Sequence, residues 1–134
     1  MKLYHLSREK DIKTLTAQVP QTQLFEDNYT KRVCFSTSID KCLTALMGDI
    51  GTYYVYIPKD ENLEVYIPST EQVFDSFLTD ETWSLEDTDV ECIGIIKNKG
   101  IIDTEEYPIS RKPYCCRLRI CDWEWVQVFD SNKI

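Results

Sequence analysis

The feature that most constrains the fold is the density of β-branched and aromatic residues in the second half of the chain. Such residues favour the pleated, half-buried surface of a strand. They predict strands at residues 52–57, 63–67, 82–85, 90–97, 114–120 and 123–129. The first two are separated by the turn-forming residues 59–62 and predict a hairpin. Because hairpin partners run in opposite directions, we expect antiparallel sheets.

The first half predicts two short strands, each followed by a helix, at residues 2–6 and 32–36. Ser7 is interpreted as the N-cap of the first helix, which is expected to end before Pro20. Ser38 is expected to cap the second helix, whose apolar positions follow the i, i+3, i+4, i+7 spacing: Ile39, Cys42, Leu43 and Leu46. This order of elements predicts an α+β fold with two short N-terminal helices packed on antiparallel sheets.

Length and charge exclude several classes. A chain of 134 residues predicts a single domain, residues 1–134. The net charge of -8 argues against non-specific nucleic-acid binding, which needs a basic surface, and suits a basic protein partner. No apolar run approaches the roughly 18 to 20 residues that span a bilayer. The start of the chain lacks the apolar segment of a secretory signal, so we expect a cytoplasmic protein with no direct membrane contact.

The chain has six cysteines and one histidine, His5. An even number of cysteines indicates disulfides in short secreted chains, but the predicted location favours reduced thiols. Three cysteines stand in apolar surroundings and are interpreted as small buried hydrophobes: Cys34, Cys42 and Cys92. The remaining three lack the paired spacing of a zinc site, so we expect no metal: Cys115, Cys116 and Cys121.

Two features near strand ends could bind a ligand. His5 stands at the end of a strand, where it could face a cleft. Alternatively, it is a half-buried histidine with a local hydrogen bond. The run Ser36-Thr37-Ser38 lies between a strand and a helix N-terminus, where hydroxyl and amide groups can bind phosphate or ribose. The alternative is that these hydroxyls only cap the helix.

A third feature is Glu81, which directly precedes a short strand. A carboxylate in this place could polarise a sugar hydroxyl or stabilise a positively charged, sugar-like transition state, as carboxylates do in glycosyl chemistry. The alternative is that Glu81 is one of 23 acidic residues on an acidic surface.

Weaker candidates remain open. A Cys-His dyad of Cys34 and His5 would need an exposed thiol near a positive charge, and the mid-strand position of Cys34 argues against this. Asp122 and Glu124 would share one face of a strand, either as paired acids or as charges that favour solubility. Trp123 and Trp125 would share the other face, either as a dimer patch or as part of the core.

The order of the three main features resembles that of an ADP-ribosyltransferase domain of the His-Tyr-Glu class, which includes the poly(ADP-ribose) polymerases and RNA 2′-phosphotransferases. The matching motifs are Leu3-Tyr4-His5-Leu6-Ser7, Arg32-Val33-Cys34-Phe35-Ser36 with the helix after it, and Glu81. The resemblance covers about residues 2–97, and residues 100–134 add further strands. It implies a split β-sandwich of the ADP-ribosyltransferase type, with NAD as the cofactor and no metal.

The resemblance also implies roles for individual residues. His5 would bind a ribose of the nucleotide and, with Glu81, form the catalytic pair. The cofactor-binding set would be His5, Leu6, Ser7, Phe35, Ser36 and Ser38, with Phe35 and Ser36 lining the nicotinamide pocket. Glu81 would be the catalytic carboxylate that orients the ribose for attack.

Two positions depart from the family pattern. Leu6 stands where the family has glycine, and Cys34 stands where it has the tyrosine that stacks on nicotinamide. Two hypotheses therefore stay open. One is an enzyme that binds NAD or an ADP-ribose-type nucleotide and transfers ADP-ribose to a protein or nucleic-acid target. The other is a catalytically degenerate acidic module, of anti-defence or inhibitor type, that sequesters a nucleotide or blocks a basic protein. By association only, such a chain suits a phage or bacterial mobile element.

Overall fold

The computed structural model describes residues 1–20, 26–108 and 115–134. Within these ranges the elements are β1 (His5–Ser7), β2 (Thr14–Leu15), β3 (Val33–Phe35), α1 (Ile39–Ala45), β4 (Gly51–Pro58), α2 (Ser76–Thr79), β5 (Thr82–Ser84), β6 (Thr88–Pro108), β7 (Cys115–Val128) and the 3-10 turn η1 (Ser131–Lys133). None of the helices in this part of the chain is long and apolar enough to cross a membrane.

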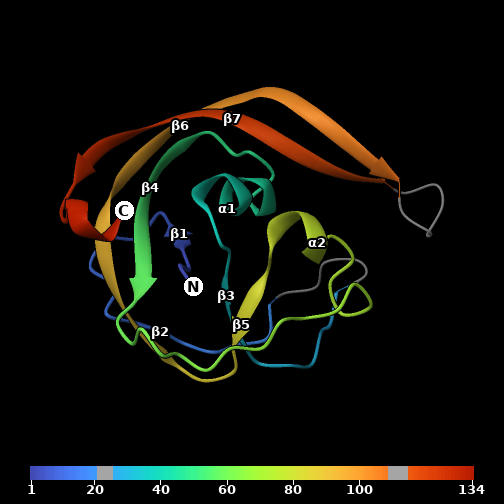
Figure 1. Cartoon of the computed structure of the whole chain (residues 1–134), viewed down its shortest axis with the longest axis horizontal. Coiled ribbons are helices and arrows are strands. Elements are labelled where there is room, and N and C mark those ends of the chain that lie inside the picture. The colour runs from blue at the N-terminus through green and yellow to red at the C-terminus, as the bar shows by residue number, and fades with distance from the viewer. Residues whose placement is uncertain (21–25, 109–114) are drawn as a thin grey trace.

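The described residues form two antiparallel sheets. In the larger one, β4 lies between β1 and β6, while β6 also pairs with β7 and β2. The smaller one joins β3 to β5. The long β6–β7 hairpin arches over α1 and extends beyond the rest of the molecule (Figure 1). The prediction of an α+β fold with antiparallel sheets is therefore confirmed.

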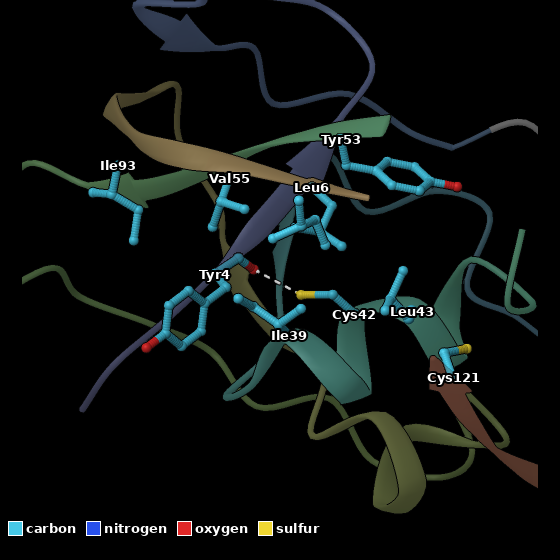
Figure 2. Packing of buried hydrophobic residues seen from close by; sticks show 10 residues of the cluster. Tyr4, Leu6, Ile39, Cys42, Leu43, Tyr53, Val55, Ile93 and Cys121 are labelled. Atoms are coloured by element: carbon cyan, nitrogen blue, oxygen red, sulfur yellow. Dashed lines mark hydrogen bonds between the residues drawn. The ribbon is translucent and has the colours of Figure 1, made fainter. Parts of the chain in front are cut away.

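Helix α1 packs three of the four residues of its predicted apolar stripe against the larger sheet, namely Ile39, Cys42 and Leu43, while Leu46 is exposed. The Ser38 hydroxyl accepts a hydrogen bond of 3.2 Å from the backbone N–H of Lys41, as expected of an N-cap. Leu43 is completely buried, and the cluster around it joins the helix to β1 and β4 through Leu6 and Val55 (Figure 2). The core thus forms between α1 and the larger sheet, and it includes Leu6 of β1.

The first predicted helix is not present: residues 8–20 are all described, and none is helical. The Ser7 hydroxyl accepts a hydrogen bond from the backbone N–H of Glu9 within a tight turn. Asp11 then adopts a left-handed backbone, with φ of 61°, which a right-handed helix cannot continue. The chain instead forms β2, because its backbone groups pair with β6, including the hydrogen bond from Val90 N–H to the Lys13 carbonyl.

The predicted hairpin of residues 52–57 and 63–67 is also wrong. Both edges of β4 are taken, by β1 and β6, and residues 63–67 contribute only a single bridge from Tyr66 to Trp83. The predicted strands at 114–120 and 123–129 form one strand, β7, in the described residues, while residue 114 lies outside them.

Candidate functional site

His5 is held by a hydrogen bond to the backbone of the neighbouring small sheet. Its Nδ1 atom lies 2.9 Å from the carbonyl oxygen of Cys34. A carbonyl only accepts hydrogen bonds, so Nδ1 carries the proton and Nε2 is left as an acceptor. Burial lowers the pKa of His5, which favours this neutral form. The ring also meets Phe35 edge to face, with ring centres 6.1 Å apart.

Glu81 is placed by a turn that connects α2 to β5. The preceding residue, Asp80, adopts a left-handed backbone with φ of 48°. Its carboxylate accepts hydrogen bonds from the Thr37 hydroxyl and the Lys41 ammonium group. These two hydrogen bonds lower the pKa of Asp80. The turn is thereby tied to the start of α1, which brings Glu81 to the same region as β3.

Five of the seven predicted site residues line one pocket of about 120 Å³: His5, Leu6, Phe35, Ser36 and Glu81. They come from β1, from β3 with its following residue, and from the turn before β5. The pocket also contacts Cys34 and Leu46. Residues that are widely separated in sequence therefore converge on a single small hollow.

Ser7 and Ser38 are not among the residues that line this pocket. The Ser7 hydroxyl accepts from Glu9, and the Ser38 hydroxyl accepts from Lys41 as the helix cap. Their predicted part in cofactor binding therefore has no support from the geometry. Local turn formation and capping account for both hydroxyls.

Phe35 and Cys34 are placed differently from what their expected roles require. Phe35 is only 1% exposed, so it forms a wall beside His5 and offers no free ring face for stacking. Burial and the nearby Glu81 carboxylate raise the pKa of the Cys34 thiol to about 12. His5 contacts the Cys34 carbonyl, and the thiol stays protonated near neutral pH, so the geometry does not support a Cys-His dyad.

The charge of Glu81 is set by opposing influences. The pKa of its carboxyl group is raised overall, with burial as the largest cause and the negative charge of Asp75 as a smaller one. Polar interactions with the Cys34 thiol and the Trp83 indole, together with the positive charge of Arg32, lower the same pKa. The carboxylate thus lies in the buried kind of setting in which functional carboxyl groups are often found.

Sequence reasoning missed Arg32 as a part of this region. Its side chain is fully buried, and its Nη1 donates to the carbonyls of Asp27 and Thr30 at 2.8 and 3.1 Å. Its Nη2 also lies 3.6 Å from a carboxylate oxygen of Glu26. In the sequence, Glu26 and Asp27 shortly precede Arg32 at the start of a strand, and this pattern could have indicated that the arginine pairs with them.

The C-terminal candidates belong to the surface and the core. Trp123 and Trp125 are partly buried and pack against the cluster around α1, and the Trp123 indole N–H donates to Asp40 at 2.8 Å. This packing supports the interpretation of the two rings as part of the core. Asp122 and Glu124 are exposed, and Glu124 pairs with Lys99 at 3.4 Å. Their placement fits surface charges.

The functional assignment of this pocket depends on its own geometry and chemistry. Comparisons of the chain with protein-family models, with curated proteins and with solved structures found no match. Two larger hollows each share one lining residue with this pocket. One of about 380 Å³ shares Glu81 with it, and one of about 630 Å³ shares Tyr4.

Proposed function

We propose that this chain is a small ADP-ribosyltransferase-like protein that binds NAD or a related ADP-ribose nucleotide at the pocket between His5 and Glu81. The proposal includes a fold of the ADP-ribosyltransferase split β-sandwich type. The observation that carries it is the convergence of His5, Phe35, Ser36 and Glu81 on one pocket. These residues belong to three motifs that are far apart in the sequence.

In this proposal each polar group has a defined task. The Nε2 atom of His5 accepts a hydrogen bond from a ribose hydroxyl, since Nδ1 is already engaged. The Glu81 carboxylate stabilises the positive charge that develops on the ribose as its bond to nicotinamide weakens. Nicotinamide leaves with the electron pair of the C1′–N bond. A nucleophilic atom of the protein or nucleic-acid acceptor then bonds to C1′ and loses its proton to solvent.

The size of the pocket determines which part of the nucleotide it could hold. Sites for small molecules commonly measure about 300 to 1,000 Å³. A hollow of about 120 Å³ suits a single ring, such as nicotinamide, and not a whole dinucleotide. In this proposal the two larger hollows, which share Glu81 and Tyr4 with the pocket, would hold the remaining nucleotide and an acceptor.

A second candidate function is a binding module without chemistry. It is favoured by the covered ring of Phe35 and by the presence of Cys34 where the related enzymes have a stacking tyrosine. Such a module would sequester a nucleotide or, with its net charge of -8, block a basic protein partner.

The two candidates are separated by measuring nicotinamide release from NAD, with and without cell lysate as a source of acceptors. The transferase proposal predicts release by the wild type and a loss of at least about 100-fold in Glu81→Gln, a typical cost of removing one charge-stabilising group. Glu86→Gln is the matched control, because Glu86 is exposed and does not line the pocket. Calorimetric binding of NAD without turnover would support the sequestering module. Absence of both binding and release would contradict any nucleotide function.

A further inference from the structure

The hollow that shares Glu81 with the candidate pocket is rimmed by exposed apolar side chains. Its volume of about 380 Å³ falls within the usual range for a small binding site, about 300 to 1,000 Å³. The apolar residues that line it are Met1, Ile67, Pro68 and Phe77. Ile67 is 66% exposed and Phe77 is 46% exposed. Large apolar side chains that surround a concavity and remain in contact with water are typical of a surface that binds a partner.

The two exposed side chains are attached to well-anchored parts of the fold. Ile67 follows Tyr66, whose backbone N–H and carbonyl form hydrogen bonds of 2.8 and 2.7 Å with the backbone of Trp83. Phe77 belongs to α2, and its ring meets Tyr107 of β6 edge to face, with ring centres 6.3 Å apart. In Figure 1, α2 lies on the side of the molecule towards which the β6–β7 hairpin extends. The apolar rim is therefore preformed, which lowers the entropy cost of binding a partner.

Several polar groups that line this hollow are already engaged within the protein. The Asp80 carboxylate accepts hydrogen bonds from the Thr37 hydroxyl at 2.7 Å and from the Lys41 ammonium group. The Thr82 hydroxyl donates to the Asp80 carbonyl at 3.0 Å. Of the two acidic residues in the lining, Asp80 forms an ion pair with Lys41, and Glu81 forms none within the described residues. Glu81 is therefore the charged side chain left to interact with an occupant.

This lining suits a protein segment better than a nucleic acid. Nucleic acids bind mainly through their phosphates, which need Lys or Arg side chains. No lysine or arginine lines the hollow in the part of the chain that the structure describes, and Lys41 beside it is paired with Asp80. The net charge of -8 would also repel a polyanion. A neutral or basic protein segment with large apolar side chains matches both the rim and the charge.

The larger hollow, of about 630 Å³, differs in its charged groups. Three lysines and three acidic residues line it: Lys2, Lys59, Lys133, Asp60, Glu61 and Glu91. Lys133 pairs with Glu91, while Lys59 forms no ion pair among the described residues. A nucleotide diphosphate needs cations, so it is better accommodated in this larger hollow. The hollow at Glu81 is then left for the acceptor.

We propose that the hollow at Glu81 is the acceptor subsite, and that the acceptor is a neutral or basic protein segment with large apolar side chains, not a nucleic acid. This inference rests on the proposed function, which leaves the class of acceptor open. Ile67 and Phe77 contact the apolar side chains of the segment, and its nucleophilic atom lies beside Glu81. That atom bonds to C1′ with its own electron pair, nicotinamide leaves with the pair of the C1′–N bond, and the acceptor's proton passes to solvent.

The first test compares transfer to acceptors with hydrolysis of NAD. The protein is given NAD labelled with ³²P in its adenylate phosphate, together with either cell protein freed of nucleic acid or RNA and DNA freed of protein. The label should enter protein and not nucleic acid. In Ile67→Ser and Phe77→Ser, the ratio of protein labelling to nicotinamide release without acceptor should fall at least about tenfold, as expected when a large apolar contact is lost.

Ile102→Ser is the matched control, because Ile102 is 69% exposed on the hairpin and does not line the hollow. It should keep the wild-type ratio. Labelling of RNA or DNA in place of protein would overturn the proposal, as would an unchanged ratio in both hollow variants. Failure of the wild type to release nicotinamide would contradict the proposed function alone, because binding to the hollow can be tested without turnover.

That second test titrates the ¹⁵N-labelled protein with acetyl-Leu-Lys-Leu-amide, with acetyl-Leu-Glu-Leu-amide and with the RNA hexauridylate. The lysine peptide should shift the backbone amide resonances of Ile67, Phe77 and Glu81. The glutamate peptide should bind more weakly, since it brings a like charge to Glu81. Hexauridylate should leave these resonances in place. Absence of shifts with the lysine peptide, or shifts of these resonances with hexauridylate, would overturn the proposal.

Discussion

The imidazole Nδ1 of His5 lies 2.9 Å from the carbonyl oxygen of Cys34, which joins the first strand to the small sheet at the edge of the candidate pocket. This relationship fixes the tautomer of the only histidine in the chain. It leaves Nε2 as the hydrogen-bond acceptor that a ribose hydroxyl would need. The same hydrogen bond thus holds His5 at the edge of the pocket and determines which nitrogen of its ring carries the proton.

The first prediction concerns this tautomer. The ¹⁵N spectrum of His5 should show a protonated Nδ1 and an unprotonated Nε2 at pH 7. Because burial lowers the pKa of His5, its midpoint of protonation should lie below the ordinary value of about 6.5. The opposite tautomer would show that the hydrogen bond to Cys34 is not made. A midpoint above the ordinary value would contradict the lowering of the His5 pKa by burial.

The second prediction concerns Glu26 and stability. Its pKa of about 7 in the folded protein exceeds the ordinary value of 4.5, so the folded state holds this proton more tightly than the unfolded state. The free energy of unfolding should therefore fall as pH rises from about 4.5 to 7. This contribution should be roughly 1 to 3 kcal/mol after allowance for solvent screening.

Glu26→Gln removes the titrating group. Urea denaturation at several pH values should show that the difference in unfolding free energy between wild type and variant changes across this window. The difference should then level off above pH 7. A difference that is independent of pH would contradict the shifted pKa. Glu86→Gln serves as the control, since it makes the same substitution at an exposed glutamate.

The third prediction concerns thiol reactivity. Burial is the largest cause that raises the pKa of Cys34, and of Cys42, to about 12. At pH 8 only about one thiol in ten thousand is then ionised, and the thiolate is the reactive form. Alkylation followed by peptide mass spectrometry should find both residues slow to react in the native protein and fast in denaturant. Rapid alkylation of Cys34 in the native protein would instead support a role for its thiol as a nucleophile.

The fourth prediction concerns the core between α1 and the larger sheet. Leu43 is fully buried in this cluster, whereas Leu46 at the end of the same helix is partly exposed. Leu43→Ala should lower the free energy of unfolding by about 2 to 5 kcal/mol, the usual range for such cavities. Leu46→Ala should cost less, and equal losses in urea denaturation would argue against this packing.

Elements whose signals were local could be predicted from the sequence. Helix α1 follows directly from the cap at Ser38 and the apolar spacing of Ile39, Cys42 and Leu43, and the structure has both. The helix expected after Ser7 had similar capping signals but lacked a strong apolar stripe. The segment forms a strand because Thr14 and Leu15 pair with β6. A pairing between residues so far apart in the chain cannot be recognised from the local sequence.

The same distinction applies to the site. The order of the motifs singled out His5 and Glu81, and both line the same pocket. The contact between Arg32 and Trp83 could not be predicted, because it arises from the register of β3 with β5 and from burial. Neither is visible as a spacing in the sequence. The burial of Phe35, which removes its ring as a stacking platform, is likewise a product of tertiary packing.

The most direct test of the central claim is to titrate the protein with NAD while observing the ¹⁵N resonances of His5. Binding at the pocket should move the Nε2 resonance, because a ribose hydroxyl would donate to it, while Nδ1 stays bonded to Cys34. The change should be retained in Glu86→Gln and should saturate as NAD is added. An Nε2 resonance that remains unchanged at saturating NAD would contradict the assignment of this pocket, whether or not NAD shifts the resonances of other residues.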